Sequence, residues 1–276
     1  MLKLKKFIQI FITTKVLFLI LLIINIIILL LLTLAVGCLP LIERKFLSLL
    51  QRRVGPLFVG YKGRLQYIAD ALKLFLKKIQ IPNSINKTNF ILFPSLVLGF
   101  SYSIWIIITW GPNVILIDTN YNLLLFVILS FLTTLNIIFT GYFSKNKYAI
   151  IASVRASMGL IHLELFMGLY FLIIFLITKS FNFNYIVYKQ YNYINLFMLL
   201  PVSSLIFFTF LLETNRTPFD LSEAESELIS GFHVEYGGFF FGLYYLGEYT
   251  HLFFFSLVTS ILIFGGWSNI NIFVVN

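Results

Sequence analysis

Residues 16–36 read VLFLILLIINIIILLLLTLAV, a stretch that contains no charged side chain. A helix rises 1.5 Å per residue, so about 20 apolar residues cross the roughly 30 Å hydrocarbon core of a bilayer. Lysines precede this run, but it is longer than the ~7–15 apolar residues of a typical signal peptide. We therefore expect a retained transmembrane helix here.

The composition extends this expectation to the whole chain of 276 residues, which is 59% hydrophobic and only 11% charged. Globular proteins average about 25% charged residues, so this chain could not cover a surface facing water. Further apolar runs long enough to span a bilayer lie at residues 89–110, 122–143, 148–177, 194–212 and 238–264. We expect an all-α, multi-pass transmembrane bundle of about six spans, forming a single integral membrane domain over residues 1–276. The run at 148–177 lacks a polar turn, so one long tilted helix is expected there.

The residue inventory excludes several chemistries within this chain. One cysteine, Cys38, and three histidines are too few for a disulfide framework, a four-cysteine iron–sulfur cluster or a cysteine-rich zinc site. With so few of these ligands, no bound metal is expected. No phosphate-binding glycine motif is present either, so no bound nucleotide is expected. The net charge of +9 comes from basic residues beside apolar spans, which lipid headgroups and membrane topology explain better than nucleic acid.

Half of the 20 Lys and Arg residues lie in residues 40–88, which should therefore face the cytoplasm or matrix. The N-terminal lysines conflict with this orientation, because they would face the other side. Within this segment, residues 64–79 carry apolar side chains at helical spacing and lysines largely on other faces. This pattern predicts an amphipathic helix at the membrane interface, which either lies on lipid or walls an entrance for a lipid-soluble ligand.

Carboxyl groups inside the apolar runs are candidate functional groups, because burying a charge in a bilayer costs several kcal/mol, about 3 or more at mid-depth. Glu164 lies in the middle of one span, Glu213 ends another, and Glu248 lies one turn before His251 in the last. The spacing of Glu248 and His251 would let a carboxyl and an imidazole exchange protons. The alternative is that these groups only stabilise helix packing.

Residues 213–236 form an acidic segment that holds more than half of the acidic residues of the chain. Asp220 and Glu223 make a capping box and Gly231 provides a stop, which predicts a short helix between them. The segment is either a solvated acidic helix or one that attracts protons or basic loops of a partner.

Several motifs together resemble subunit 1 of NADH:ubiquinone oxidoreductase, respiratory complex I, over about residues 16–266. They are ERK at 43–45, RVGP at 53–56, QYIADALKLF at 66–75, KYA at 147–149, ETNRTPFD at 213–220 and EY at 235–236. The resemblance implies a subunit of the mitochondrial inner membrane that forms part of the quinone chamber and couples quinone reduction to proton translocation. It implies ubiquinone as substrate, with NADH, FMN and iron–sulfur clusters held only by partner subunits. The implied partners are the other membrane and peripheral-arm subunits.

The resemblance also assigns residues. It implies that the quinone passage involves Arg44, Arg53, Asp70 and Phe219, and that the proton path involves Glu164, Glu213, Asp220, Glu223, Glu225, Glu227 and Glu248.

Two departures from the family pattern stand out. The family usually has Lys-Glu-Pro after the amphipathic helix, where this chain has Lys77-Lys78-Ile79. The family also continues through two further helices, so we expect a separate polypeptide to supply them beside residues 194–264. The alternatives are a proton-coupled secondary transporter using Glu164 and Glu248, which would predict an internal repeat, and a structural membrane anchor.

Overall fold

The computed structural model describes residues 2–83, 85–111, 114, 115, 117, 119–191, 195–214 and 231–268, with only the backbone given for 2–25, 114, 197 and 198. The chain divides into two compact units, Met1–Pro56 and Leu57–Asn276.

The first unit is a single helix, α1 (Leu2–Leu50), followed by a short segment, residues 51–56, in which the chain turns back on the helix end. The helix ends in a Schellman motif, in which Arg53 N donates to Ser48 O at 2.9 Å and Arg52 N to Leu49 O at 3.2 Å. Arg52 takes the left-handed backbone conformation that glycine usually supplies (φ 52°). Gly55 then lies so near Ser48 that an added Cβ would stand 2.8 Å from its hydroxyl oxygen. The RVGP motif is thus folded against the end of α1.

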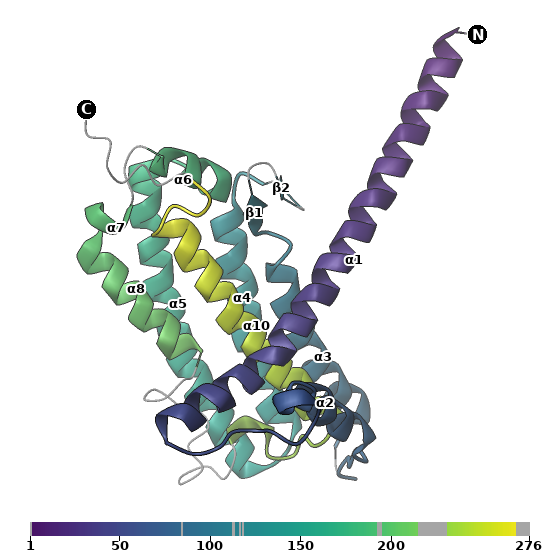
Figure 1. The fold of residues 1–276 in the computed structure, drawn as a ribbon, viewed down its shortest axis with the longest axis vertical. Coiled ribbons are helices and arrows are strands. Elements are labelled where there is room, and N and C mark those ends of the chain that lie inside the picture. The colour runs from purple at the N-terminus through teal and green to yellow at the C-terminus, as the bar shows by residue number, and fades with distance from the viewer. Residues whose placement is uncertain are drawn as a thin grey trace. The chain divides into compact units, whose positions relative to one another are not determined.

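The second unit is built almost entirely of helices, as Figure 1 shows. They are α2 (Gln66–Leu76), α3 (Lys87–Ile104), α4 (Asn122–Phe143), α5 (Lys147–Thr178), α6 (Phe183–Gln190), α7 (Asn195–Met198), α8 (Leu200–Glu213) and α10 (Phe239–Leu262). Short 3-10 turns lie at Tyr61–Gly63 and Gly231–His233, and β1 (Thr109–Gly111) pairs antiparallel with β2 (Val114–Ile115). The predicted all-α class is confirmed.

Three described helical segments are long and apolar enough to cross a membrane: Ile26–Leu50 of α1, α4 and α5. The apolar α8 is shorter. Residues 147–178 form the one long helix expected for that run. In the segment predicted to span at 89–110, α3 ends at Ile104, because the following amides bond three residues back and the chain then enters β1. Six crossings stay a prediction.

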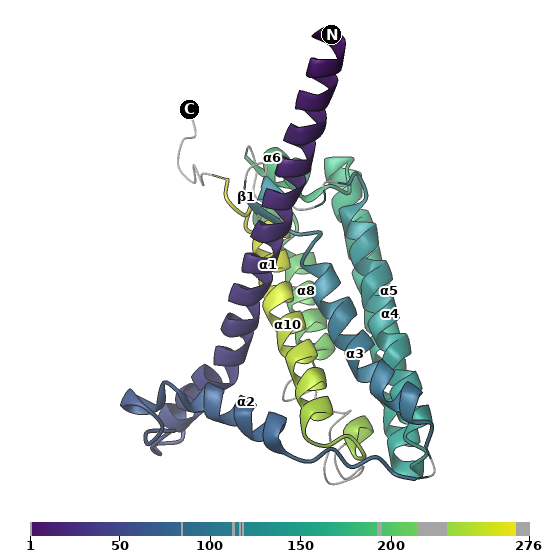
Figure 2. The same ribbon diagram turned by 90° about the vertical axis from the view of Figure 1, so that its right-hand side faces the viewer.

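Helices α4 and α5 form an antiparallel pair joined by a short turn, and they lie alongside each other in Figure 2. One face of α5 carries small side chains that are buried: Ala149, Ala152 and Ser153 are all 1% exposed or less. A Cβ added to Gly141 of α4 would overlap Ser153 and stand 2.9 Å from the Ala149 carbonyl oxygen. Small residues let two helix backbones approach closely inside a bilayer. The opposite face of α5 exposes large apolar side chains such as Leu165, as expected for contact with lipid.

Helix α2 lies within the predicted amphipathic segment 64–79, and its C-terminal end packs against the first turns of α10. The rings of Phe75 and Phe239 are 5.3 Å apart. A Cβ on Gly238 would stand 3.1 Å from the Lys77 carbonyl oxygen, and one on Gly242 would stand 3.4 Å from Leu74. A glycine at the N-cap of α10 and another in its first turn therefore let α2 approach the backbone directly.

Candidate functional site

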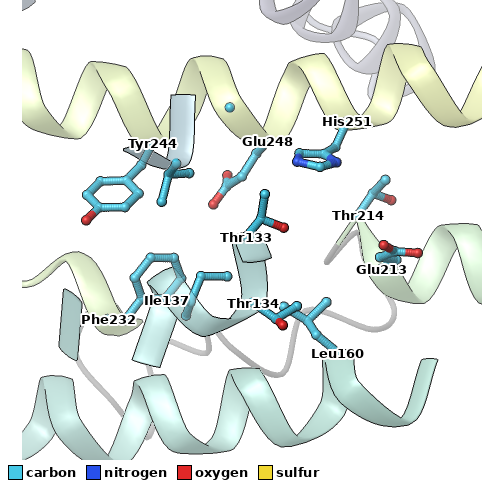
Figure 3. Close-up of a pocket in the computed structure, with 12 residues that line it drawn as sticks. Thr133, Thr134, Ile137, Leu160, Glu213, Thr214, Phe232, Tyr244, Glu248 and His251 are labelled. Carbon is cyan, nitrogen blue, oxygen red and sulfur yellow. The ribbon is translucent and has the colours of Figure 1, made fainter. Parts of the chain in front are cut away.

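A cavity inside the helical bundle of the second unit brings together the polar side chains of several helices (Figure 3). It measures about 60 Å³, enough for a few water molecules. Its walls come from α3, α4, α5, α8 and α10 with the turn before α10. The lining residues are Val97, Thr133, Thr134, Ile137, Leu160, Glu213, Thr214, Phe232, Tyr244, Gly247, Glu248 and His251.

Glu213 reaches the cavity from the last residue of α8. The preceding turn is apolar, so the carboxyl group is the first ionisable side chain at this end of the helix. One carboxyl oxygen, Oε2, is buried and has no hydrogen-bond partner among the described residues. A buried oxygen without a protein partner is where an internal water is expected.

Glu164 lies on α5, one helical turn beyond the cavity residue Leu160, and is 7% exposed. The side chain of Thr134 on α4 is the neighbour of Glu164. The Glu164 carboxyl group also lies near enough to Glu213 of α8 for the two charges to interact. Its Oε1 has no hydrogen-bond partner in the described part of the chain. Ionising two neighbouring carboxyl groups inside an apolar bundle is costly, so one of them tends to hold a proton. That proton can pass to the other when the other is ionised.

Glu248 and His251 both reach the cavity from α10, and Figure 3 shows Glu248 extending toward Thr133 with the imidazole beside it. The residue before Glu248 is Gly247, which packs against α3. A Cβ there would stand 3.3 Å from both the Ser101 hydroxyl and Val97. Close packing of α10 on α3 thus directs the next residue of the helix into the cavity.

The threonines of the cavity wall were not predicted as site residues. Thr133 and Thr134 lie in an apolar run, where a hydroxyl side chain is usually satisfied by its own helix, and both do donate to a backbone carbonyl three residues back. The detectable signal was their spacing. Ser130, Thr133, Thr134 and Thr140 are buried on α4 and mark a polar face.

The predicted quinone residues are distributed differently. Arg44 and Arg53 belong to the first unit and Asp70 to the second, so their grouping stays a prediction. Asp70 lies on α2, where its Oδ1 accepts a hydrogen bond of 3.0 Å from Gln66 Nε2. Phe219 lies outside the described residues.

Much of the acidic segment also lies outside the described residues, including Asp220, Glu223, Glu225 and Glu227. At its end, Glu235 accepts a hydrogen bond of 2.7 Å from Asn146 Nδ2 in the turn between α4 and α5.

Among the residues that the structure describes, no group of three or more His, Cys, Asp or Glu side chains is placed so that it could hold a metal ion.

The fold and the cavity define a class: a helical integral membrane protein in which carboxyl side chains from separate helices lie close together within the bundle. Comparison with known proteins is more specific. A family model described as NADH dehydrogenase matches residues 21–275. The chain belongs to this NADH dehydrogenase family.

Individual relatives agree with this assignment. The chain is 50% identical to NADH-ubiquinone oxidoreductase chain 1 of Paramecium tetraurelia, over 85% of this chain and 90% of the relative. It is 39% identical to the protein of the same name from Chondrus crispus, over 90% of this chain and 76% of the relative. A bacterial relative, an NADH-quinone oxidoreductase subunit from Rhodospirillum centenum, is 38% identical over 84% of this chain and 69% of the relative. The resemblance inferred from the motifs is confirmed, and it favours the complex I interpretation over a transporter.

Proposed function

We propose that this chain is a subunit of NADH:ubiquinone oxidoreductase in the mitochondrial inner membrane, where its cavity carries protons that move in step with ubiquinone reduction. The names of the relatives support the enzyme and the substrate. The arrangement of side chains within the bundle supports the role in proton movement.

The observation that carries the proposal is the meeting of carboxyl groups from three helices. Glu213 of α8 and Glu248 of α10 line one cavity, and Glu164 of α5 lies one turn from its wall. Burying several carboxyl groups in an apolar bundle is costly, and hydrophobic side chains of similar volume would pack as well. Titratable groups beside a cavity large enough for water can instead take up and release protons.

The quinone passage is proposed for the basic side of the chain, from Arg44, Arg53, Asp70 and Phe219. An isoprenoid tail needs an apolar wall and a quinone head needs polar donors. Helix α2 offers the first, since Leu72, Phe75 and Leu76 are exposed on it, and the polar residues offer the second. Asp220, Glu223, Glu225 and Glu227 would continue the proton path from Glu213.

The chain supplies protein groups rather than electron carriers in this proposal. NADH, FMN and iron–sulfur clusters would belong to partner subunits. The other membrane subunits and those of the peripheral arm would be its partners, with lipid around the exposed apolar faces. The separate polypeptide that would supply two further helices stays a prediction, which a structure of the intact complex would test.

The test is to replace Glu164, Glu213 and Glu248 singly by glutamine in the intact complex. Glutamine keeps shape and hydrogen bonding but cannot titrate, so proton pumping and coupled quinone reduction should fall about 100-fold or more. NADH oxidation by a hydrophilic artificial acceptor should be unchanged, which reports on assembly.

Glu235→Gln is the matched control. Its amide oxygen can still accept the hydrogen bond from Asn146, and Glu235 does not line the cavity. It should pump normally. Normal pumping in all three cavity variants would contradict the proposal and leave these groups a packing role.

A further inference from the structure

The cavity lining includes a histidine that neither the family motifs nor the proposed proton path includes, His251. It lies on α10, three residues after Glu248, and both line the cavity. Figure 3 shows its imidazole between Glu248 and the end of α8, where Thr214 and Glu213 lie.

The surroundings of this imidazole come from three directions. Glu248 lies on its own helix, Glu213 and Thr214 face it from α8, and Thr133 and Thr134 face it from α4. Glu164 of α5 is a titratable group one turn beyond the lining residue Leu160. The ring centroid of Phe255, on the same helix as His251, is 6.2 Å from that of the imidazole.

His251 differs from the other ionisable side chains of the cavity lining in the sign of the charge that it can carry. Among the described residues that line it, the ionisable ones are two carboxyl groups, a tyrosine and His251, and none is Lys or Arg. Within that lining, His251 is the side chain that can hold a positive charge. A group of this kind between two carboxyl groups can accept a proton from either side.

We infer that His251 transfers protons between Glu248 and Glu213, an inference that rests on the proposed function of the cavity. One ring nitrogen accepts a proton from the Glu248 side, directly or through a cavity water, as the O–H bond breaks and an N–H bond forms. The other ring nitrogen releases its proton toward Glu213. The imidazole is neutral again after both transfers and returns to its starting tautomer by rotation of the ring. The net result is one proton moved from Glu248, which becomes ionised, to Glu213, which becomes neutral.

A second histidine lies outside the cavity and bonds to its own helix. His162 on α5 is exposed, and its Nδ1 lies 2.5 Å from the Met158 carbonyl oxygen of its own helix. It does not line the cavity. His162 therefore provides a matched control for the same substitution outside the cavity lining.

The first experiment compares His251→Gln with His162→Gln in the intact complex. Proton pumping and coupled quinone reduction are measured across pH, with hydrophilic-acceptor activity as the assembly check. His251→Gln should lower coupled turnover by about tenfold, less than the loss of a full acid–base catalyst because waters can bridge the gap, and should change the shape of its pH profile. His162→Gln should match the native complex.

The outcomes separate this inference from the proposed function. If Glu213→Gln and Glu248→Gln lose pumping while His251→Gln keeps the native rate and pH profile, the inference is overturned and the proposed function stands. If the carboxyl variants also pump normally, both are overturned.

A rescue experiment separates proton transfer from space filling. His251→Ala leaves a void beside the cavity, to which free imidazole or its isostere pyrazole is added. Pyrazole has nearly the same shape but does not take up a proton near neutral pH. Restoration by imidazole alone supports the inference. Equal restoration by both compounds, or by neither in an assembled complex, overturns it.

Discussion

Replacing Gly141 by alanine tests whether the α4–α5 pair is packed as closely as the structure has it. The new methyl group would overlap the Cβ and Oγ of Ser153 and stand 2.9 Å from the Ala149 carbonyl oxygen. Rotation of the serine moves only its hydroxyl, so the overlap with Cβ persists in every rotamer.

The size of the effect follows from this overlap. Carbon atoms pack best about 3.5–4.0 Å apart, so the helices would have to separate by roughly 1 Å or more. Overpacking of this kind costs about 1–3 kcal/mol, a shift of about 5- to 150-fold in favour of the separated helices. Thr134 and Leu160 lie two turns from the contact on α4 and α5, so the separation would also open the cavity wall.

The assay is the amount of assembled complex on native gels and the half-life of quinone reductase activity at elevated temperature. Gly141→Ala should lower both. Adding Ser153→Gly removes the Cβ and should restore much of the loss, whereas adding Ser153→Ala keeps the Cβ and should not. Native assembly and half-life in Gly141→Ala alone would refute the close approach of these helices.

Two further predictions address the basic side of the chain. Arg53→Ala or Asp70→Asn should lower quinone reduction while NADH oxidation by a hydrophilic acceptor is kept, and equal loss of both activities would indicate failed assembly instead. Burial raises the pKa of Tyr236 to about 12 from an ordinary value near 10. Between these values the folded protein holds a proton that the unfolded chain has lost, so this residue should lower stability as pH rises. Tyr236→Phe, which keeps the ring stacked 4.2 Å from Phe90, should make thermal inactivation less sensitive to alkaline pH, and an identical pH dependence would disprove the assignment.

The helices were predictable because a bilayer satisfies the backbone only in helices or closed β-barrels, and continuous apolar runs of about 20 residues fit helices. Their ends were less so. The run of residues 89–110 has no charged side chain and is mostly apolar as far as Trp110, yet α3 stops at Ile104, since the choice between one more helical turn and the short β1–β2 pair depends on tertiary contacts. Composition carries no such information.

The site was predictable residue by residue but not as an arrangement. Glu164, Glu213 and Glu248 are conspicuous in sequence, because charges inside apolar runs are costly. Their common cavity depends on how α5, α8 and α10 pack, which spacing along a single helix cannot specify. In the sequence, the threonines that complete the cavity wall look the same as hydroxyl residues that only bond to their own helix.

The glycine contact between α2 and α10 has a mechanical consequence. Gly238 and Gly242 bring the end of α2 close to the backbone of α10, where the Lys77 carbonyl oxygen and the Leu74 side chain meet it, so little space is left to absorb a displacement. Glu248 lies about 15 Å further along α10 than Gly238 and about 9 Å further than Gly242, given a rise of 1.5 Å per residue. Because a helix of this length is stiff, a displacement of α2 that moves the first turn of α10 also moves the rest of α10. A molecule that pushes on the amphipathic helix at the membrane surface is thereby linked to the position of a carboxyl group deep in the bundle.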